Sequence, residues 1–535
     1  MPKNYLIGIG GTGAKAIEAT LYMCAAGSGP DELSVFLIDP DKGNGNLDRT
    51  TKLISKYLDC QKIFKSANAD TKLFKTKIKT PDQEKDRVWN IFKTTDATLK
   101  DWIGEEGMQG AEKDLANILF SKLEMTTQLN EGFRGHPAIG SVVMTEIPDN
   151  ELPVKMLWDE MPNSKAFDIK IFLVGSVFGG TGAAGFPTLG HENTLKYNKD
   201  KDTFTIDDKG GKLSRVLLGG ALVLPYFKVV KNNDVPGMYV TSNDFPIATK
   251  AALEFYDAKD NLGFDQIYFL GDSIAPKVGD FSVGSSSQKN KPHYIEVVSG
   301  LAAFDFFKQP SINKKPEPMY FIAKRDSDIV NWSNLPYTRE KDDIDEKKNE
   351  FKELITTMTL FSYVLVTYAK SLFNPSNDSK NEPEFSAEWY KSNFRHKQKI
   401  FSKFKNKEDE IRLNLRESSN KEALDKFTAF SEDFLNWIVG LQDDEYFNVN
   451  LIDKFQIVNG DDWKDPFNQP FVGHLLKESS NKMVWTDFVK LGIDDAEINK
   501  AIQANTKTFS AANRLINLFY EGSNNFAKLN YTLKK

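Results

Sequence analysis

The stretch DIKIFLVGSVFGGTGAAGFPTLG, residues 168–190, most constrains what this chain can fold into. It begins with a nearly continuous apolar run, the pattern of a strand that a parallel sheet buries on both faces. A turn of Gly179, Gly180, Thr181 and Gly182 follows. Successive N–H groups of such a turn point into one concavity, and the next helix adds the positive end of its dipole. The stretch therefore predicts a strand, a phosphate-binding turn and a helix. A turn that only packs the helix on the strand is the alternative.

The N-terminus repeats this design in residues 5–22, YLIGIGGTGAKAIEATLY. A short apolar strand leads into a glycine loop, and a helix is expected from about Ala14. The second turn consists of Gly10, Gly11, Thr12 and Gly13. Two GGTG turns in one chain predict a single ligand held from two loops of one sheet.

The segment after the first helix supports a dinucleotide as one such ligand. Residues 34–39, SVFLID, predict a second strand that ends on Asp39. The loop from Gly8 to Gly13 fits GxGxxG, and an acid after the second strand binds the adenosine ribose in NAD-binding Rossmann units. An NAD-dependent oxidoreductase is therefore one hypothesis, although it leaves the second GGTG turn unexplained. A cap on the polar turn PDKGNGN is the other explanation for Asp39.

Composition narrows the class of protein. A chain of 535 residues has room for several domains, and its net charge of −6 argues against general nucleic-acid binding. Its only cysteines, Cys24 and Cys60, exclude a disulfide framework and favour a reducing cytosol. The sequence shows no metal-ligand spacing, no signal peptide and no apolar run of membrane-spanning length, so a cytoplasmic protein is expected.

Strand and helix patterns alternate through the next part of the chain. Strands are predicted at residues 213–227 and 264–272, and helices at 243–258 and 293–307. This alternation predicts an α/β fold with a doubly wound, mostly parallel sheet. Ligands of such sheets bind at the carboxyl ends of the strands, where the glycine turns are expected to lie.

A further loop, NEGFRGHPAIGSVVM at residues 130–144, has the composition of a phosphate contact. Arg134 and Gly135 could present a guanidinium and a backbone amide to a terminal phosphate. A structured turn before a helix at residues 138–144 explains the loop equally well.

Together these pieces resemble the GTP-binding domain of the tubulin/FtsZ family, over about residues 1–335. The central turn resembles the family signature GGGTGSG, with Phe178 in place of the first glycine. GIGGTG resembles the first phosphate loop, LIDPD the second strand and its loop, and GFRGHPAIG the loop that senses the γ-phosphate. The sequence looks most like the divergent bacterial tubulin-like proteins, some of which belong to conflict or antiviral systems.

The resemblance implies GTP as the ligand, with Mg²⁺ bridging its phosphates through water. Both GGTG turns would hold the phosphates, and Arg134 and Gly135 would approach the γ-phosphate. The family often reads the base with an asparagine, where this sequence offers Asp272 after Gly271. Head-to-tail self-association into filaments, with nucleotide at the interface, is also implied.

Hydrolysis is less well supported than binding. Family members that polymerise supply acids from a loop patterned NxDxxD, and here Asn331 fits the asparagine while Ser333 and Pro336 stand at the acid positions. Asp326 and Asp328 lie just upstream and are the candidates to orient the attacking water. A nucleotide-stabilised scaffold that never hydrolyses GTP is the alternative.

The domain organisation follows from these patterns. Residues 1–340 are expected to form the nucleotide domain, with a helical insertion at about 47–130 that carries no chemistry. A long helix at 341–373, a polar linker at 374–387 and a mainly helical module at 388–535 complete the chain, the last of these a possible site for a protein partner. Within that module Lys391–Lys407 holds seven basic residues and no acid, a stretch that suits an acidic partner or nucleic acid. An amphipathic helix with solvated lysines is the simpler explanation.

Overall fold

The structure is a computed structural model, and it describes most of residues 3–442 together with 510–532. The longer undescribed ranges are 146–168, 192–215, 231–241, 281–289, 310–318, 336–349, 374–394 and nearly all of 443–509. Arg134, Asp326, Asp328, Asn331 and the predicted linker at 374–387 lie outside the described residues.

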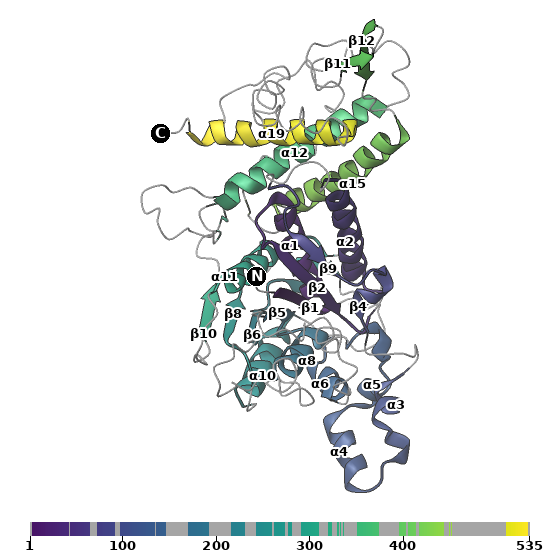
Figure 1. The fold of residues 1–535 in the computed structure, drawn as a ribbon. Coiled ribbons are helices and arrows are strands. Elements are labelled where there is room, and N and C mark those ends of the chain that lie inside the picture. Colours follow the sequence, from purple (N-terminus) through teal and green to yellow (C-terminus); the bar gives the residue numbers. More distant parts are fainter. Residues whose placement is uncertain are drawn as a thin grey trace, which may run out of the picture.

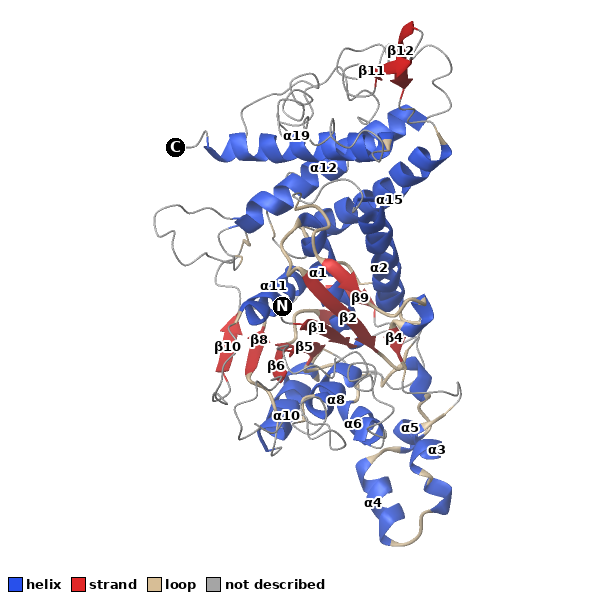
Figure 2. Cartoon of the chain, viewed as in Figure 1, coloured by secondary structure: helices blue, strands red, loops and turns tan. Residues whose placement is uncertain are grey.

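The described chain is built around one parallel sheet of eight strands (Figures 1 and 2). Its strands are β1 (Lys3–Ile9), β2 (Glu32–Ile38), β3 (Lys77–Lys79), β4 (Val88–Trp89), β5 (Ile169–Ser176), β6 (Val216–Val223), β8 (Gln266–Leu270) and β10 (Met319–Ala323). Their order is β10-β8-β6-β5-β1-β2-β3, and β4 also pairs with β2. Every pairing in this sheet is parallel, which confirms the predicted α/β fold.

The order of the strands reverses between β1 and β5. These two strands pair directly, with Lys3 opposite Ile169 and Gly8 opposite Val174. Each is followed by a glycine-started helix: α1 (Gly10–Ala26) after β1 and α8 (Gly180–Leu189) after β5. Reversal points of this kind are where open α/β sheets bind their ligands.

Helices cover both faces of the sheet. In Figure 1, α1, α2 (Gly45–Phe64) and α11 (Tyr294–Lys308) lie above it, and α6 (Pro137–Thr145), α8 and α10 (Phe245–Ala258) lie below it. The strands β1, β2 and β5 are buried almost along their whole length because they have helices on both sides. A separate parallel pair is formed by β7 (Lys228–Val230) and β9 (Lys277–Asp280).

The last long helices add a layer outside α1 and α2. They are α12 (Glu350–Phe373), α15 (Ser418–Gly440) and α19 (Ala511–Thr532). Aromatic rings join α15 to the layer beneath it, because Tyr22 packs against Phe430, Phe434 and Trp437. The buried apolar residues of the described chain form one continuous cluster, so these helices share a core with the sheet.

Residues 47–130 were expected to be an insertion, and this prediction is wrong for its first half. The helix α2 covers the sheet, and β3 and β4 are strands of that sheet. Only the second half leaves the body, as an arm with α3 (Leu99–Ile103), α4 (Ala111–Leu119) and α5 (Lys122–Met125) (Figure 1). Three short 3₁₀ turns, Glu84–Asp86, Glu105–Gly107 and Leu129–Glu131, punctuate this region.

The prediction of a helix over the basic stretch Lys391–Lys407 is also wrong. Strands β11 (Arg395–Ser402) and β12 (Lys405–Arg412) form an antiparallel hairpin there. Basic residues recur at every second position in Arg395, Lys397 and Lys399, which is the period of a strand, and that period prevails over the phenylalanine spacing. The described helix α12, Glu350–Phe373, lies within the range 341–373 that was predicted as one long helix, and α15 lies within the helical pattern expected before residue 440. None of the described helices is long and apolar enough to cross a membrane.

Candidate functional site

The structure brings the two GGTG turns together. Gly10 is the first residue of α1 and has a φ of +72°. A Cβ atom placed on Gly10 would lie 3.4 Å from the Cβ of Thr181 and 3.5 Å from the backbone nitrogen of Gly182. The first turns of α1 and α8 therefore lie against each other at the carboxyl ends of the two central strands.

Both turns belong to helices rather than to loops. The sequence placed the first helix from about Ala14, yet α1 begins at Gly10, and α8 begins at Gly180 with the extended residue Gly179 as its N-cap. The first four N–H groups of an α-helix have no partner within the helix, and the helix dipole places a partial positive charge there. Two such helix starts side by side are suited to bind an anion with several oxygens, such as a polyphosphate.

The glycines of the first turn have two different roles. Gly11 is half-buried, and a Cβ on it would lie 3.5 Å from the amide nitrogens of Asn44 and Asn46, which is an ordinary contact. A Cβ on Gly13 would lie only 2.6 Å from the carbonyl carbon of Gly8. Gly13 is therefore needed for the packing of helix on strand, whereas Gly11 keeps a partly exposed backbone beside Asn44 and Asn46.

The glycines of the central turn are closely packed. A Cβ on Gly180 would lie 2.7 Å from the Cβ of Phe133, and one on Gly182 would lie 2.6 Å from the carbonyl oxygen of Ser176. Phe178, which stands where the resemblance predicts a glycine, packs against three aromatic rings: those of Tyr226, Phe227 and Phe245. This aromatic packing explains how a large side chain is accommodated beside the turn.

The loop after β2 forms the floor next to Gly11. Asp39 is only 3% exposed, and its Oδ1 accepts the N–H of Asp41 at 3.0 Å. Burial raises the pKa of Asp39 to about 8, and the neighbouring carboxylate of Asp41 adds to the rise. Asn46 ties the loop to a distant segment, because its Oδ1 accepts the N–H of Asn290 at 3.0 Å. Asp39 therefore stabilises its own loop and does not present an open carboxylate to a ribose.

The predicted γ-phosphate loop contacts both the loop after β2 and the central glycine turn. A Cβ on Gly132 would be 3.8 Å from the Cβ of Asp41, and Phe133 packs on Gly180. Gly135 has a φ of +80°, a conformation that favours glycine. At the end of the loop, His136 Nδ1 lies 3.2 Å from Glu124 Oε1 in the arm, while burial lowers the pKa of His136. The loop thus links the glycine turns to the arm.

A buried polar network backs the first turn. Tyr226, just after β6, donates to Glu296 Oε1 at 3.5 Å. Glu296 forms a fully buried ion pair with Lys15 of α1, and Lys15 Nζ donates to the carbonyl oxygen of Lys291 at 2.7 Å. Burial raises the pKa of Glu296, and Lys15 opposes that rise. The network joins the start of α1 to the start of α11.

The structure places Asp272 beside His293, the residue that caps α11. The His293 Nδ1 atom accepts the N–H of Ile295 at 3.1 Å, so in the neutral ring the proton is on Nε2. Nε2 lies 3.5 Å from Asp272 Oδ2, and both side chains are buried. The Asp272 carboxylate, expected to read a base, is thus paired with a histidine.

Sequence reasoning missed Lys15, Tyr226, His293 and Glu296. The spacing of His293 and Glu296 matches a helix capping box, which was a usable signal. Nothing local marks Lys15 as buried, because its partner lies far along the chain. The acids Asp326 and Asp328, with Asn331 and Arg134, lie in undescribed ranges.

Neither a metal site nor a known relative identifies the function of this site. Within the described ranges, no group of three or more His, Cys, Asp or Glu side chains could hold a metal ion. No family model matches the chain, and no curated protein matches it either. Function is therefore inferred from the residues and geometry of the chain itself.

Proposed function

We propose that this chain is a tubulin-like protein that binds GTP, with the phosphates held between the first turns of α1 and α8. One observation carries the proposal: at the reversal point of the sheet, a Cβ placed on Gly10 would lie 3.4 Å from the Cβ of Thr181. Gly11, Thr12 and Gly179 are half-buried, so part of this junction remains exposed. Gly10, Gly13, Gly180 and Gly182 shape the backbone around them.

Mg²⁺ would be held mainly by the phosphates and by water. Magnesium at nucleotide sites keeps several waters and takes few protein ligands, so a cage of carboxylates is not required. In the two GGTG turns, the hydroxyls of Thr12 and Thr181 are the side-chain oxygens that could contact the ion or its water. When bound, the ion would neutralise phosphate charge.

The buried Asp39 favours GTP over NAD. A dinucleotide site of the Rossmann type needs a carboxylate after the second strand that can accept hydrogen bonds from the ribose hydroxyls. Here that carboxylate is 3% exposed and already accepts a backbone N–H of its own loop. The second GGTG turn is also accounted for by a compact triphosphate and not by the dinucleotide layout.

The same proposal includes head-to-tail self-association with the nucleotide at the interface. Hydrolysis would then depend on residues supplied by the neighbouring copy, with Asp326 and Asp328 as the candidate acids and Asn331 as the candidate asparagine of the loop. A scaffold that binds GTP without turnover is the second form of the proposal, supported by Ser333 and Pro336 at the family's acid positions.

Nucleotide binding is tested with Gly11→Ala and the matched control Gly107→Ala. Gly107 lies in the arm and has nothing within 4 Å of an added Cβ. We expect Gly11→Ala to weaken GTP binding about tenfold, which is about 1.4 kcal/mol, because the added methyl group would take up space that the proposed ligand needs while the backbone N–H is kept. The control should bind as the wild type does. Titration calorimetry with GTP, ATP and NAD measures this, and unchanged GTP binding by Gly11→Ala, or binding of NAD alone, would refute the proposal.

Assembly and turnover are tested in one experiment. Wild-type protein is sedimented with GTP, GDP or a non-hydrolysable GTP analogue, and phosphate release is followed in the same tubes. Pelleting with release identifies a polymerising GTPase, and Asp326→Ala and Asp328→Ala should then abolish release. Pelleting without release identifies the scaffold form. Absence of GTP-dependent pelleting rules out filament assembly.

A further inference from the structure

The side-chain amide of Asn46 is directed at the first glycine turn. Asn46 lies in the first turn of α2 and is only 1% exposed. Its Nδ2 atom lies 3.5 Å from the place that a Cβ on Gly11 would take, and its Oδ1 atom accepts the N–H of Asn290 at 3.0 Å. Because a backbone N–H can only donate, this contact puts the amide oxygen on the Asn290 side and the NH₂ group on the Gly11 side.

Asn44 holds the start of α2 in this position. It precedes the helix, and its Oδ1 atom accepts the backbone N–H of Asn46 at 2.9 Å, which is the contact of a helix N-cap. The Nδ2 atom of Asn44 also lies 3.5 Å from the Cβ position on Gly11. The start of α2 therefore brings two side-chain amide groups to the start of α1.

Two cations behind the first turn are already paired with acids. Lys15 and Arg49 each form a salt bridge with a glutamate. Arg49 also donates to the carbonyl oxygen of Asn290 at 3.2 Å, so it holds the same residue that Asn46 contacts. A phosphate at this turn would therefore be met by neutral N–H donors, as in other glycine turns that bind phosphate through amide groups.

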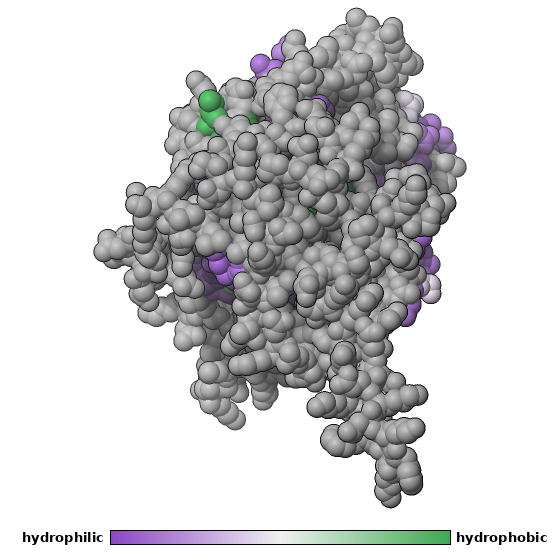
Figure 3. Space-filling view, turned by 90° about the horizontal axis from the view of Figure 1, so that it is seen from above, coloured by the Kyte–Doolittle hydropathy of each residue, from purple (hydrophilic) through white to green (hydrophobic). Residues whose placement is uncertain are grey.

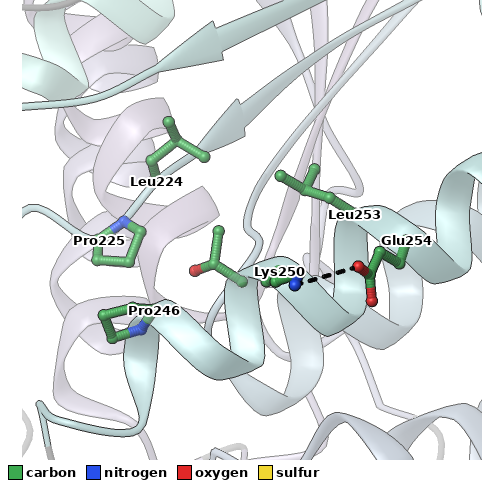
Figure 4. Close-up of a pocket in the computed structure, with 7 residues that line it drawn as sticks. Leu224, Pro225, Pro246, Lys250, Leu253 and Glu254 are labelled. Atoms are coloured by element: carbon green, nitrogen blue, oxygen red, sulfur yellow. Dashed lines mark ion pairs between the residues drawn. The ribbon is translucent and has the colours of Figure 1, made fainter.

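The groove along α10 offers a phosphate a different environment. It has a volume of about 500 Å³, and much of its lining is apolar, with Pro225, Pro246 and Leu253 (Figure 4). Its cation, Lys250, pairs with Glu254 at 3.6 Å. Hydrophilic residues occur at several separate places on the face shown in Figure 3, so a hydrophilic surface by itself does not mark a site. The buried amides beside the first glycine turn match a phosphate better than this groove does.

We propose that Asn46 binds a phosphate oxygen of the ligand through its Nδ2 group while its Oδ1 atom holds the segment before α11. Gly11 lies in the first turn of α1, where backbone N–H groups have no partner within the helix, so a ligand oxygen seated there is within reach of the Asn46 amide. One side chain then links the polyphosphate to Asn290 and so to α11. The inference rests on the proposed function and assigns a side chain to its phosphate site.

Asn46→Asp separates the two halves of this amide. Aspartate keeps an oxygen for the N–H of Asn290, but it replaces the NH₂ donor by a carboxylate oxygen that repels phosphate. The new charge lies at the N-terminal ends of α1 and α2, where negative charge is stabilised, so we expect the urea midpoint of the ligand-free protein to stay near that of the wild type. GTP binding, measured by calorimetry with Mg²⁺, should weaken about a hundredfold or more. Asn117→Asp makes the same change at an exposed position of α4 and should bind as the wild type does.

Asn46→Ala distinguishes a ligand contact from a structural one. It removes both contacts of the amide, so we expect lower stability together with GTP binding about tenfold weaker. If Asn46 only holds Asn290, Asn46→Asp will bind GTP like the wild type while Asn46→Ala does not, and that pattern overturns the inference. Should Asn46→Asp fail to fold, Asn44→Asp places a carboxylate beside the same Gly11 position and keeps the N-cap, and wild-type binding by that variant overturns the inference as well.

Inorganic tripolyphosphate separates this inference from the proposed function. It carries phosphates without a base or a ribose, so Asn46→Asp should weaken its binding by the same factor as the binding of GTP. A loss confined to GTP would place Asn46 at the base or the ribose and overturn the inference. If the wild type binds tripolyphosphate with this dependence on Asn46 but does not bind GTP, the inference stands and GTP is refuted as the ligand. If the wild type binds neither, both are refuted.

Discussion

The two GGTG turns have the same four residues, yet different forces hold them. Behind the first turn, α1 is tied to other elements by charge: Lys15 pairs with Glu296, and Arg49 donates to both carboxylate oxygens of Glu18 at 2.7 and 2.6 Å. Beside the second turn, the neighbours are the backbone and Cβ of Phe133 and the aromatic ring of Phe178. A short glycine motif therefore does not determine its own support.

The difference follows from the surroundings of the two helices. The helix α1 is covered by α2, α11 and the C-terminal helices, so its polar side chains are buried and need partners. The helix α8 packs against α6, and Phe178 just before α8 packs its ring against the rings of Tyr226 and Phe227, which follow β6. We therefore expect removal of a charged side chain behind the first turn, and removal of a large side chain beside the second turn, to lower the stability of the protein.

The largest effect is expected for Phe178→Ala. This substitution removes a ring that is 3% exposed and contacts Tyr226, Phe227 and Phe245, and such a loss costs about 3–5 kcal/mol. Urea unfolding of the ligand-free protein measures it. The exposed Phe321→Ala is the control, with a shift under about 1 kcal/mol. A small effect of Phe178→Ala would mean that aromatic packing does not support the central turn.

Lys15→Met is expected to cost about 2–3 kcal/mol near neutral pH. It leaves Glu296 buried without its cation, and breaking a buried pair costs about 3–5 kcal/mol before Glu296 takes up a proton to relieve part of it. Burial already raises the pKa of Glu296, and loss of Lys15 raises it further. The folded variant then binds a proton that the unfolded chain releases, so its stability should fall as pH rises above the unfolded pKa of about 4.3.

Unfolding midpoints of Lys15→Met and wild type between pH 4.5 and 8 measure this dependence. Lys52→Met, which removes an exposed pair with Asp48, should show no comparable slope. A deficit for Lys15→Met that stays constant with pH would contradict a charge-based support of the first turn.

Much of the fold was predictable because its signals are local. The run Val216–Val223 is apolar throughout, and Ile169–Ser176 is apolar except for Lys170 and its last residue, so buried parallel strands followed directly. The short strands β3 and β4 were missed because three and two residues carry no period. The β11–β12 hairpin was missed because its alternating lysines were set aside in favour of a helical phenylalanine spacing.

The candidate site was predictable only in its backbone. Glycines at Gly10, Gly11, Gly180 and Gly182 announce close approach whatever surrounds them, and the structure brings these turns together. The side chains behind them depend on contacts far apart in the sequence, as Lys15 with Glu296 and Asp272 with His293 show. The position of Asp39 after a predicted strand did not indicate that it is buried, because its burial depends on the conformation of the loop that follows.

Gly182→Ala tests how closely the central turn is packed. The added methyl would lie 2.6 Å from the carbonyl oxygen and 2.7 Å from the nitrogen of Ser176, and this backbone cannot move aside without disturbing β5. Overpacking of this kind costs about 1–3 kcal/mol. Urea unfolding without ligand measures the loss, and wild-type stability would show that the turn yields more easily than its contacts indicate.

Gly11→Ala should change the stability of the ligand-free protein least. Its methyl makes ordinary contacts at 3.5 Å with Asn44 and Asn46, and alanine suits the first turn of a helix better than glycine does. We therefore expect the variant to be unchanged or up to about 1 kcal/mol more stable, by the same urea unfolding. Equal destabilisation by Gly11→Ala and Gly182→Ala would contradict the inference that the second turn is more closely packed than the first at these positions. Unchanged stability with lost GTP binding would assign the room at Gly11 to the ligand.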